Sequence, residues 1–425
     1  MRLHERQFLV GPDLLDLDDS LPLVETGRGF RLGIELHVGR GGGSHALAGR
    51  FVTVEDDTIT LDAIGSLACY YRQIDGDMWA SSSPELLRAL EPRLNYPRER
   101  LEWGSERNWF PPPLSGIEGI RRLLPSQSLN IHDGSVAKYA HLPEIPSLSY
   151  AEALDAIETL LRRTVSAAAE RFPLWVPLTA GADSRLILAA CVAENLDVTT
   201  FTFEAPDGHQ HPQDRLLPPR IAETAGVEHR LFCPRRPDPE LEHLFDTHTA
   251  FHSHDLDRAL MVRGQWEHVP KEVLVLGGNG WEVGRCYYWR EQPPVPDEYR
   301  AWLAEHPSEL DWRDRLYIDQ RMAGWLGANE QGLDVTGRQR IHPTNCGELL
   351  ALLLALPVSR RRDGHYRAEL VRRLCPPLGR IPINPSLTMA EALGRRIKLE
   401  RALLRDRELH YVSHRLGQAL RRFRS

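Results

Sequence analysis

Apolar and polar positions alternate in short runs along the first third of the chain, which is the pattern of antiparallel strands with one buried face. A single short helix is predicted over 83–92. One Asp-Asp pair and two Asp-Gly pairs interrupt the alternation, and tight turns are expected there. The pairs are Asp56-Asp57, Asp75-Gly76 and Asp133-Gly134. The stretch from about residue 29 to 139 therefore predicts a set of β-hairpins.

The pattern changes after residue 146. Ser149 and Glu152 form a capping box ahead of a long amphipathic helix over 150–172. Beyond this helix, apolar strands alternate with further helices. The strands are expected at 175–178, 197–203, 229–233 and 272–276, and the helices at 184–194 and 216–226. Such alternation predicts a parallel, doubly wound sheet, and the final third of the chain reads as mostly helical.

Small side chains join the first of these strands to the helix that follows it. The link from Thr179 to Ser184 contains only small or short polar residues. Ligands of parallel sheets bind beyond the carboxyl ends of the strands, and the free amides of a helix N-terminus favour an anion such as phosphate. A helix start at which Asp183 or Ser184 satisfies these amides explains the same pattern. The local pattern leaves both interpretations open.

Length and composition narrow the class of protein. A chain of 425 residues favours two domains, and 42% hydrophobic with 26% charged residues is typical of a soluble globular protein. No apolar stretch approaches the roughly 18 residues needed to span a bilayer, and the N-terminal segment lacks a signal-peptide core. The six cysteines are scattered without a C-x-x-C pair, which argues against a zinc site or a disulfide framework. We therefore expect a cytoplasmic protein with no membrane partner.

Charge is distributed unevenly along the chain. The net charge is −7, but residues 395–425 sum to +7 because they hold ten Arg or Lys and three acids. The preceding 394 residues therefore sum to −14, and nucleic-acid binding is not expected. The basic segment also carries an apolar stripe, which predicts a C-terminal helix packed on the body of the protein. Its charge could instead attract an acidic partner, such as a carrier protein or a leader peptide.

The link 179–184 lacks the Walker and dinucleotide glycine patterns. It resembles the SGGxDS pyrophosphate loop of the asparagine synthetase-like ATP pyrophosphatases, with Thr179 and Ala180 in place of Ser and Gly. The later turn 277–282, GGNGWE, is similar to the glycine-rich acidic turn SGEGADE of asparagine and β-lactam synthetases. The resemblance implies an adenine nucleotide alpha-hydrolase-like (PP-loop) fold, in which Asp183 and Glu282 hold Mg²⁺ against the pyrophosphate of ATP.

The resemblance also implies roles for residues around ATP. Lys398, the only lysine after Lys271, is expected to neutralise the leaving pyrophosphate, and Tyr288 is expected to be catalytic. Asn279 departs from the family, which often has an acid there, so activation of the substrate is expected to differ. The residues expected to contact ATP are Leu178, Thr179, Ala180, Gly181, Asp183, Ser184, Phe203, Gly277 and Gly278.

Residues 1–145 resemble, more faintly, the α+β glutaminase domain of the Ntn type that precedes these synthetases, and 146–425 resemble the synthetase domain. The glutaminase domain normally opens with a nucleophilic cysteine after the initiator Met. This chain has Arg2 at that position and no cysteine before Cys69. We therefore expect a degenerate domain that does not hydrolyse glutamine and that covers the synthetase site.

These features together predict an ATP-dependent ligase that forms AMP and pyrophosphate. It would adenylate a small-molecule or peptide carboxylate and couple it to an amine, in a specialised biosynthetic pathway. Two rivals stay open. One is an ATP pyrophosphatase that modifies a nucleobase or tRNA, and the other is a non-catalytic synthetase that serves as a binding or scaffold subunit. The departures at Thr179, Ala180 and Asn279 keep the second rival open.

Three smaller features have ordinary explanations. The H-x-H pairs His209/His211 and His252/His254 could meet at a metal ion, but histidines in loops rich in proline and aspartate are more often exposed polar residues. Asp214 is expected either as an acid that related enzymes place before the next helix or as a helix cap.

Overall fold

The structure is a computed structural model of the 425-residue chain. Lys398, the basic segment 395–425 and both H-x-H pairs lie outside the residues that it describes, so their predicted roles stay predictions. The described residues are 3–4, 6–41, 43–94, 101–103, 106–110, 112–204, 212–233, 235–236, 238–249, 262, 264–290 and 297–386.

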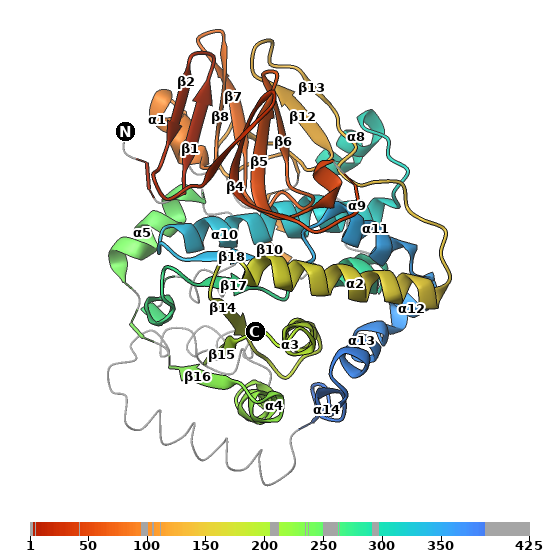
Figure 1. Cartoon of the computed structure of the whole chain (residues 1–425). Coiled ribbons are helices and arrows are strands. Elements are labelled where there is room, and N and C mark those ends of the chain that lie inside the picture. The colour runs from red at the N-terminus through yellow and green to blue at the C-terminus, as the bar shows by residue number, and fades with distance from the viewer. Residues whose placement is uncertain are drawn as a thin grey trace, which may run out of the picture.

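Two antiparallel sheets face each other in the N-terminal part of the chain (Figure 1). One has the strand order β11-β7-β8-β1-β2, and the other has the order β13-β12-β6-β5-β4-β3. Phe8, Val52 and Tyr71 belong to the core that they enclose. The strands are β1 (Phe8–Gly11), β2 (Leu14–Leu17), β3 (Leu23–Thr26), β4 (Gly29–His37), β5 (Leu47–Glu55), β6 (Thr58–Leu61), β7 (Tyr70–Ile74), β8 (Asp77–Ser81), β11 (Arg121–Arg122), β12 (Gln127–Asn130) and β13 (Val136–Lys138), with β9 (Leu101–Trp103) and β10 (Glu106–Trp109) as a separate pair.

The hairpins predicted from the alternating pattern are confirmed. The chain turns at Asp56-Asp57 between β5 and β6, at Asp75-Gly76 between β7 and β8, and near Asp133-Gly134 between β12 and β13. Within the described part of residues 1–145, the only α-helix is α1 (Pro84–Leu90), beside the short 3₁₀ helix η1 (Ser44–Ala46). Helices from later in the chain contact this part instead, so the likeness to an α+β glutaminase stays a prediction.

A five-stranded parallel sheet forms the second part of the molecule, in the order β16-β15-β14-β17-β18. The chain starts at the central strand β14, adds β15 and β16 on one side, and then crosses to add β17 and β18 on the other. The order therefore reverses between β14 and β17. The strands are β14 (Leu174–Pro177), β15 (Val198–Phe203), β16 (Glu228–Phe232), β17 (Leu274–Leu276) and β18 (Gln339–Ile341).

Both faces of the parallel sheet are covered, as the doubly wound prediction requires. Leu174 and Val176 of β14 pack into a large core with α2, α3 and α4. Trp175, which points to the opposite face, packs with Phe245 of α5 and Leu333 of α10. Successive residues of a strand point to opposite faces, so the continuous apolar run of β14 follows from burial on both sides.

Helices flank the sheet, and α2 and α10 lie between much of it and the N-terminal strands (Figure 1). They are α2 (Tyr150–Ala169), α3 (Asp183–Ala193), η2 (Pro212–Asp214), α4 (Leu217–Ala225), α5 (Pro239–His248), η3 (Gly264–His268), η4 (Trp281–Arg285), α7 (Tyr287–Arg290), α8 (Asp297–Glu305), α9 (Trp312–Leu316), the π-helix η5 (Tyr317–Leu326), α10 (Gly327–Asp334), α11 (Gly347–Ala355), α12 (Val358–Asp363), α13 (Tyr366–Leu374) and α14 (Pro376–Gly379).

The elements around the link 179–184 match the sequence prediction closely. The capping box of α2 is formed, because Ser149 Oγ accepts a bond from the Glu152 amide and the Glu152 carboxylate accepts one from the Ser149 amide. The predicted strands and helices from 175 to 233 are all present. The prediction of a mostly helical final third is incomplete, because β18 lies there and forms the edge of the parallel sheet.

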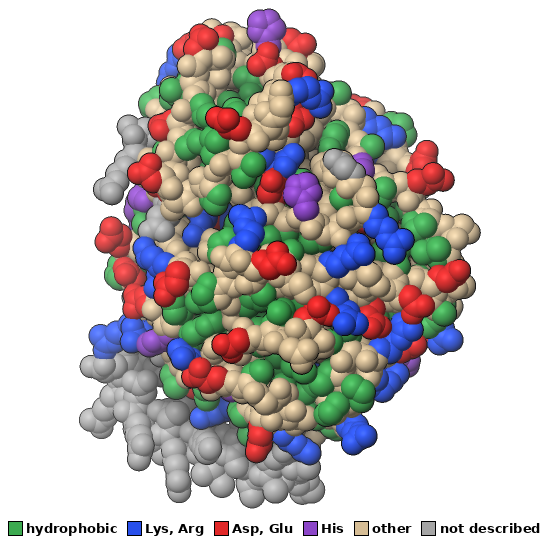
Figure 2. Space-filling view, viewed as in Figure 1, with side chains coloured by type: hydrophobic (Ala, Val, Ile, Leu, Met, Phe, Trp, Pro, Cys, Tyr) green, Lys and Arg blue, Asp and Glu red, His purple; other side chains and the backbone are tan. Residues whose placement is uncertain are grey.

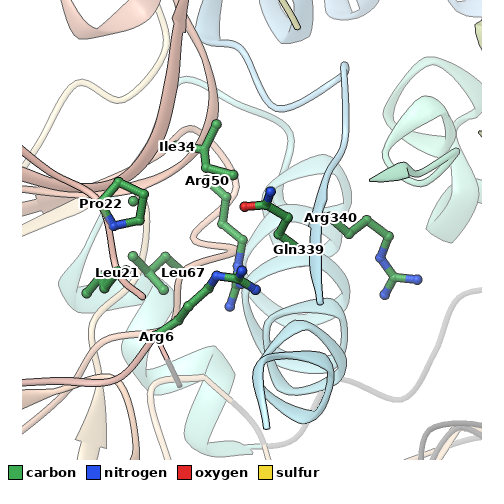
Figure 3. A pocket seen from close by; sticks show the side chains of 9 residues that line it. Arg6, Leu21, Pro22, Ile34, Arg50, Leu67, Gln339 and Arg340 are labelled. Carbon is green, nitrogen blue, oxygen red and sulfur yellow. The ribbon is translucent and has the colours of Figure 1, made fainter. Parts of the chain in front are cut away.

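A buried polar contact joins the two parts of the molecule. Arg50 of β5 donates to both carboxylate oxygens of Asp334 on α10, each at 2.6 Å, and both side chains are almost fully buried. Arg6 lies 4.0 Å from the same carboxylate. Figure 3 shows Arg6 and Arg50 beside Gln339 of β18, around a cavity of about 10 Å³. A cavity of this size has room for about one water molecule.

The surface in view carries interspersed acidic and basic side chains over the described residues (Figure 2). None of the helices that the structure describes combines the length and the apolar character needed to cross a bilayer. All six cysteines are free, and only Cys233 is exposed.

Candidate functional site

The two glycine-bearing turns meet where the strand order of the parallel sheet reverses. One follows β14 and leads into α3, and the other follows β17. A Cβ at Gly278 would lie 3.1 Å from the amide nitrogen of Ser184, so the second turn packs directly on the N-terminus of α3. In open α/β sheets, ligands bind at this reversal point, beyond the carboxyl ends of the strands.

The first turn is held by bonds within the chain. Ser184 Oγ accepts from the Thr179 amide at 3.1 Å, and Thr179 Oγ1 accepts from the Gly181 amide at 3.2 Å. The amide of Ala180 donates to Asp214 at 2.7 Å. Asp214 therefore holds the turn itself. Leu178 is buried, and its carbonyl accepts from Thr202 Oγ1.

The N-terminus of α3 has no side-chain cap among the described residues. Its N-cap is Ala182, and the hydroxyl of Ser184 is directed to Thr179 instead. The first amides of an α-helix carry unsatisfied donors and the positive end of the helix dipole. Of the two interpretations that the sequence left open, the side-chain-capped helix start is therefore wrong, and the arrangement suits an anion placed before α3.

Two carboxylates and two guanidinium groups meet in front of these turns. Arg367 of α13 donates to Asp183 Oδ1, and its side chain is 14% exposed. Arg285 Nη1 lies 3.6 Å from Asp183 Oδ2 and 3.8 Å from Glu282 Oε1. One guanidinium group therefore bridges the two residues that the sequence assigned to a metal.

The surroundings of Asp183 raise the pKa of its carboxyl group. Burial raises the pKa of Asp183, the Glu282 carboxylate raises it further, and Arg367 and Arg285 only partly oppose this. Glu282 is also held by the Gly280 amide, which donates to its Oε2 at 3.1 Å. Two carboxylates that repel each other at a partly buried position need a cation between them.

The second turn is held in place by hydrogen bonds to the segment that follows β18. The amide of Asn279 donates to His342 Nδ1 at 3.3 Å, and its carbonyl accepts from Thr344 Oγ1. His342 Nε2 in turn lies 3.0 Å from Glu330, which is fully buried. Gly280 has a φ of +97°, and a Cβ there would lie 2.2 Å from Thr344 Oγ1. Only glycine fits this position.

Aromatic side chains border the site beyond Glu282. Tyr288 is buried, and its ring centroid lies 5.9 Å from that of Tyr317. Burial first, and then the Glu282 carboxylate that is hydrogen-bonded to Tyr317, raise the pKa of Tyr317. Tyr317 of η5 is therefore in contact with Glu282. The role predicted for Tyr288 stays a prediction, and Tyr288 supports the Tyr317 ring.

The other predicted ATP contacts are distributed around the two turns. Gly277 is paired to β18 through its amide, and a Cβ there would lie 2.3 Å from His342 Cε1. Phe203 lies at the carboxyl end of β15, where its ring packs on Trp266 with 4.8 Å between centroids. The fold therefore brings most of the predicted site residues together at the two turns, with Phe203 at the end of the next strand. The residues at the turns are Leu178, Thr179, Ala180, Gly181, Asp183, Ser184, Gly277, Gly278 and Glu282.

Sequence reasoning missed the residues that come from distant segments. Arg285 and Arg367 were not assigned a role, although Arg285 follows the second turn directly and Arg367 belongs to the sequence His365-Tyr366-Arg367. His342 was missed because β18 was missed. A signal for Arg285 was present, since a cation placed three residues after an acid in a short helix lies beside it.

The residues present suit Mg²⁺ together with a phosphate ligand. Among the described residues there is no group of three or more His, Cys, Asp or Glu that could hold a metal ion by itself. Mg²⁺ is usually bound by one or two carboxylates, with water and substrate phosphates completing its coordination. Asp183 and Glu282 supply such a pair, beside the uncapped N-terminus of α3.

Comparisons with known proteins add little to this picture. No family model matches the chain, and no curated protein matches it. Solved structures do align with parts of it, among them the following two. NMN synthetase from Francisella tularensis shares 17% identity over 33% of this chain, with a TM-score of 0.24, and the chain spans 59% of that protein's length. The U34-tRNA thiolase NcsA from Methanococcus maripaludis shares 12% identity over 56% of this chain and 86% of that one, also with a TM-score of 0.24. These likenesses are too weak to assign a function, and the strand order itself defines the fold.

Proposed function

We propose that the protein is an ATP-dependent, AMP-forming ligase that adenylates a substrate carboxylate and couples it to an amine. The observation that carries this proposal is the junction of the two glycine turns. There the uncapped N-terminus of α3 lies against Gly278, in front of the carboxylates of Asp183 and Glu282. A pyrophosphate group needs such a combination of free amides, metal-binding carboxylates and cations.

ATP would lie with its phosphates before α3 and its adenine toward the ends of β14 and β15. The amides at the start of α3 and the small residues of the first turn allow close approach of phosphate oxygens. Asp183 and Glu282 would hold Mg²⁺, which neutralises charge on the phosphates. Arg285 and Arg367 lie at the same place and supply further positive charge.

In the first step an oxygen of the substrate carboxylate attacks the α-phosphorus of ATP, and the bond to the β-phosphate oxygen breaks. Pyrophosphate leaves, and an acyl-adenylate is formed. In the second step the amine nitrogen attacks the acyl carbon, AMP leaves, and the amine loses a proton. The buried aromatic side chains beyond Glu282 suit the body of the acid substrate, because they exclude water from the reactive adenylate.

The amine is proposed to be free, or part of the substrate, rather than derived from glutamine. Cys69 is the first cysteine of the sequence, and burial raises the pKa of its thiol to about 12. A thiol in that state is not a nucleophile. The proposals of an acidic carrier or leader partner for residues 395–425, and of a cytoplasmic location, rest on the sequence alone.

The first test is binding of MgATP, measured by isothermal titration calorimetry. We expect the wild-type chain to bind, and Asp183→Asn and Glu282→Gln to lose most of the affinity, because each keeps size and hydrogen bonding but removes a metal-binding charge. Asp155→Asn is the matched control, since Asp155 is exposed and pairs with Arg373 away from the site. Equal affinity in Asp183→Asn and the wild type would contradict the metal assignment.

The second test is formation of AMP. Hydroxylamine intercepts acyl-adenylates as hydroxamates without knowledge of the natural amine, so it is added with ATP and a panel of amino acids and dicarboxylic acids. We expect hydroxamate and AMP in equal amounts with at least one acid. A chain that binds MgATP but forms AMP with no acid would instead favour the scaffold interpretation. AMP formation that depends on added tRNA would favour the nucleobase-modifying one.

A further inference from the structure

Arg285 and Arg367 occupy the positions where the proposed site needs its metal. Arg367 donates to Asp183 Oδ1, and Arg285 bridges Asp183 Oδ2 and Glu282 Oε1. The two carboxylates and the two guanidinium groups sum to zero charge. The pair of carboxylates is therefore neutralised by the protein itself when neither metal nor nucleotide is bound.

Both arginines lie along one turn, which gives them a common support. Gly364 ends α12 with a φ of +66°, and a Cβ there would lie 3.2 Å from Arg367 Nη2 and 3.9 Å from Arg285 Cγ. Arg367 Nε donates weakly to the Gly364 carbonyl at 3.4 Å. The side chain of Arg367 is 14% exposed and that of Arg285 is 28% exposed, so both remain accessible to a ligand that enters in front of α3.

We propose that Arg285 and Arg367 exchange partners when MgATP binds, a step that rests on the proposed function. Mg²⁺ prefers the hard carboxylate oxygens, whereas the planar guanidinium group binds phosphate through two parallel hydrogen bonds. The metal therefore takes the carboxylates, and the arginines turn to the phosphates. Without metal the carboxylates stay paired with the two arginines, and the same arginines supply two cations to the phosphates when the nucleotide arrives.

The exchange predicts two effects of opposite sign for one substitution. Arg367→Met keeps an unbranched side chain against α3 but removes the competitor for Asp183. Binding of Mn²⁺ alone, a probe for the Mg²⁺ site, should become tighter by about tenfold, because a charge-assisted hydrogen bond no longer has to be broken. Binding of MgATP should become weaker by about tenfold or more, because a phosphate contact is lost.

The experiment measures both affinities by isothermal titration calorimetry on the full chain. The variants are Arg367→Met, Arg285→Met and Arg367→Lys, and the control is Arg373→Met. Arg373 lies on the same helix and pairs with Asp155 outside the site, so its substitution should move neither affinity. Arg367→Lys keeps a positive charge but cannot donate two parallel hydrogen bonds as a guanidinium group does. Its Mn²⁺ affinity should therefore stay near that of the wild type, and its MgATP affinity should fall only partly. Thermal unfolding of each variant identifies any general loss of structure.

The outcomes separate this inference from the proposed function. If the wild type binds no MgATP, the proposed function fails and the inference fails with it. If the wild type binds MgATP, but the two affinities of Arg367→Met fall together or do not change, only the inference is overturned. Arg367 would then serve to fasten α13 to α3, which are packed against each other.

Discussion

Glu330 is the buried acid on which the support of the second glycine turn depends. It accepts hydrogen bonds from Arg340 at 2.8 and 2.6 Å, and His342 Nε2 lies 3.0 Å away. Burial alone raises the pKa of Glu330, but Arg340, followed by His342 and Arg50, outweighs it and lowers the pKa to about 2. Glu330→Gln removes this charge and leaves the guanidinium group of Arg340 without its carboxylate partner.

The size of the effect follows from the change in pKa. At about 1.4 kcal/mol for each pKa unit, the change from the ordinary value of 4.5 to about 2 corresponds to about 3 kcal/mol of folding free energy. Because the folded-state pKa is lowered, this contribution is fully present above pH 4.5 and is lost as the pH falls toward 2. At pH 3.5 about 1 kcal/mol of it has already gone, because the unfolded chain is by then mostly protonated.

Urea unfolding followed by tryptophan fluorescence measures this difference. We expect the free energy of unfolding of Glu330→Gln to be about 3 kcal/mol lower than that of the wild type at pH 7. This difference between the two proteins should shrink by about 1 kcal/mol at pH 3.5. Glu228→Gln is the control, because Glu228 also pairs with an arginine but on the exposed edge strand β16. A gap of the same size at both pH values would refute the electrostatic reasoning and assign the loss to packing.

Three further predictions concern the site and the chain around it. Gly280→Ala should abolish AMP formation in a folded protein, because the new Cβ would meet Thr344 Oγ1 at 2.2 Å in a left-handed backbone conformation; full activity would contradict the geometry of the turn. Lys398→Ala should lower turnover by about a few hundredfold with little change in ATP affinity, as expected for a charge contact made in the transition state; a change below about threefold in steady-state kinetics would remove Lys398 from the site. Glutamine should not serve as nitrogen donor, and release of glutamate above background would reveal an unexpected glutaminase site.

Local signals explain why the first half of the candidate site could be predicted from the sequence. β14 is continuously apolar, and the link 179–184 consists of small residues. The capping box of α2 is formed by two residues within four consecutive positions, Ser149 and Glu152. Each of these features is set by neighbours in the chain. The second turn was found because its glycines follow directly on the apolar strand β17.

Long-range pairing explains what could not be predicted. β18 has only three residues, and its membership of the sheet depends on pairing with β17. Arg367 lies 184 positions from Asp183 in the sequence, and no local pattern encodes their contact. Tyr317, which begins a π-helix, was assigned no role, because it lies 35 positions after Glu282 and no local pattern encodes their contact.

The contact between Arg50 and Asp334 has a consequence for how the protein is made. The two residues are 284 positions apart, so the buried face around Arg50 leaves the ribosome long before its partner is synthesised. At about 5–20 residues per second, the interval is roughly a quarter of a minute to a minute. During that time the N-terminal sheets present an uncovered guanidinium group and uncovered apolar side chains such as Ile34 and Leu36, which favours chaperone binding and aggregation. Fragments that end before residue 334 should therefore be poorly soluble, and slower translation between 60 and 330 should lower the yield of soluble protein.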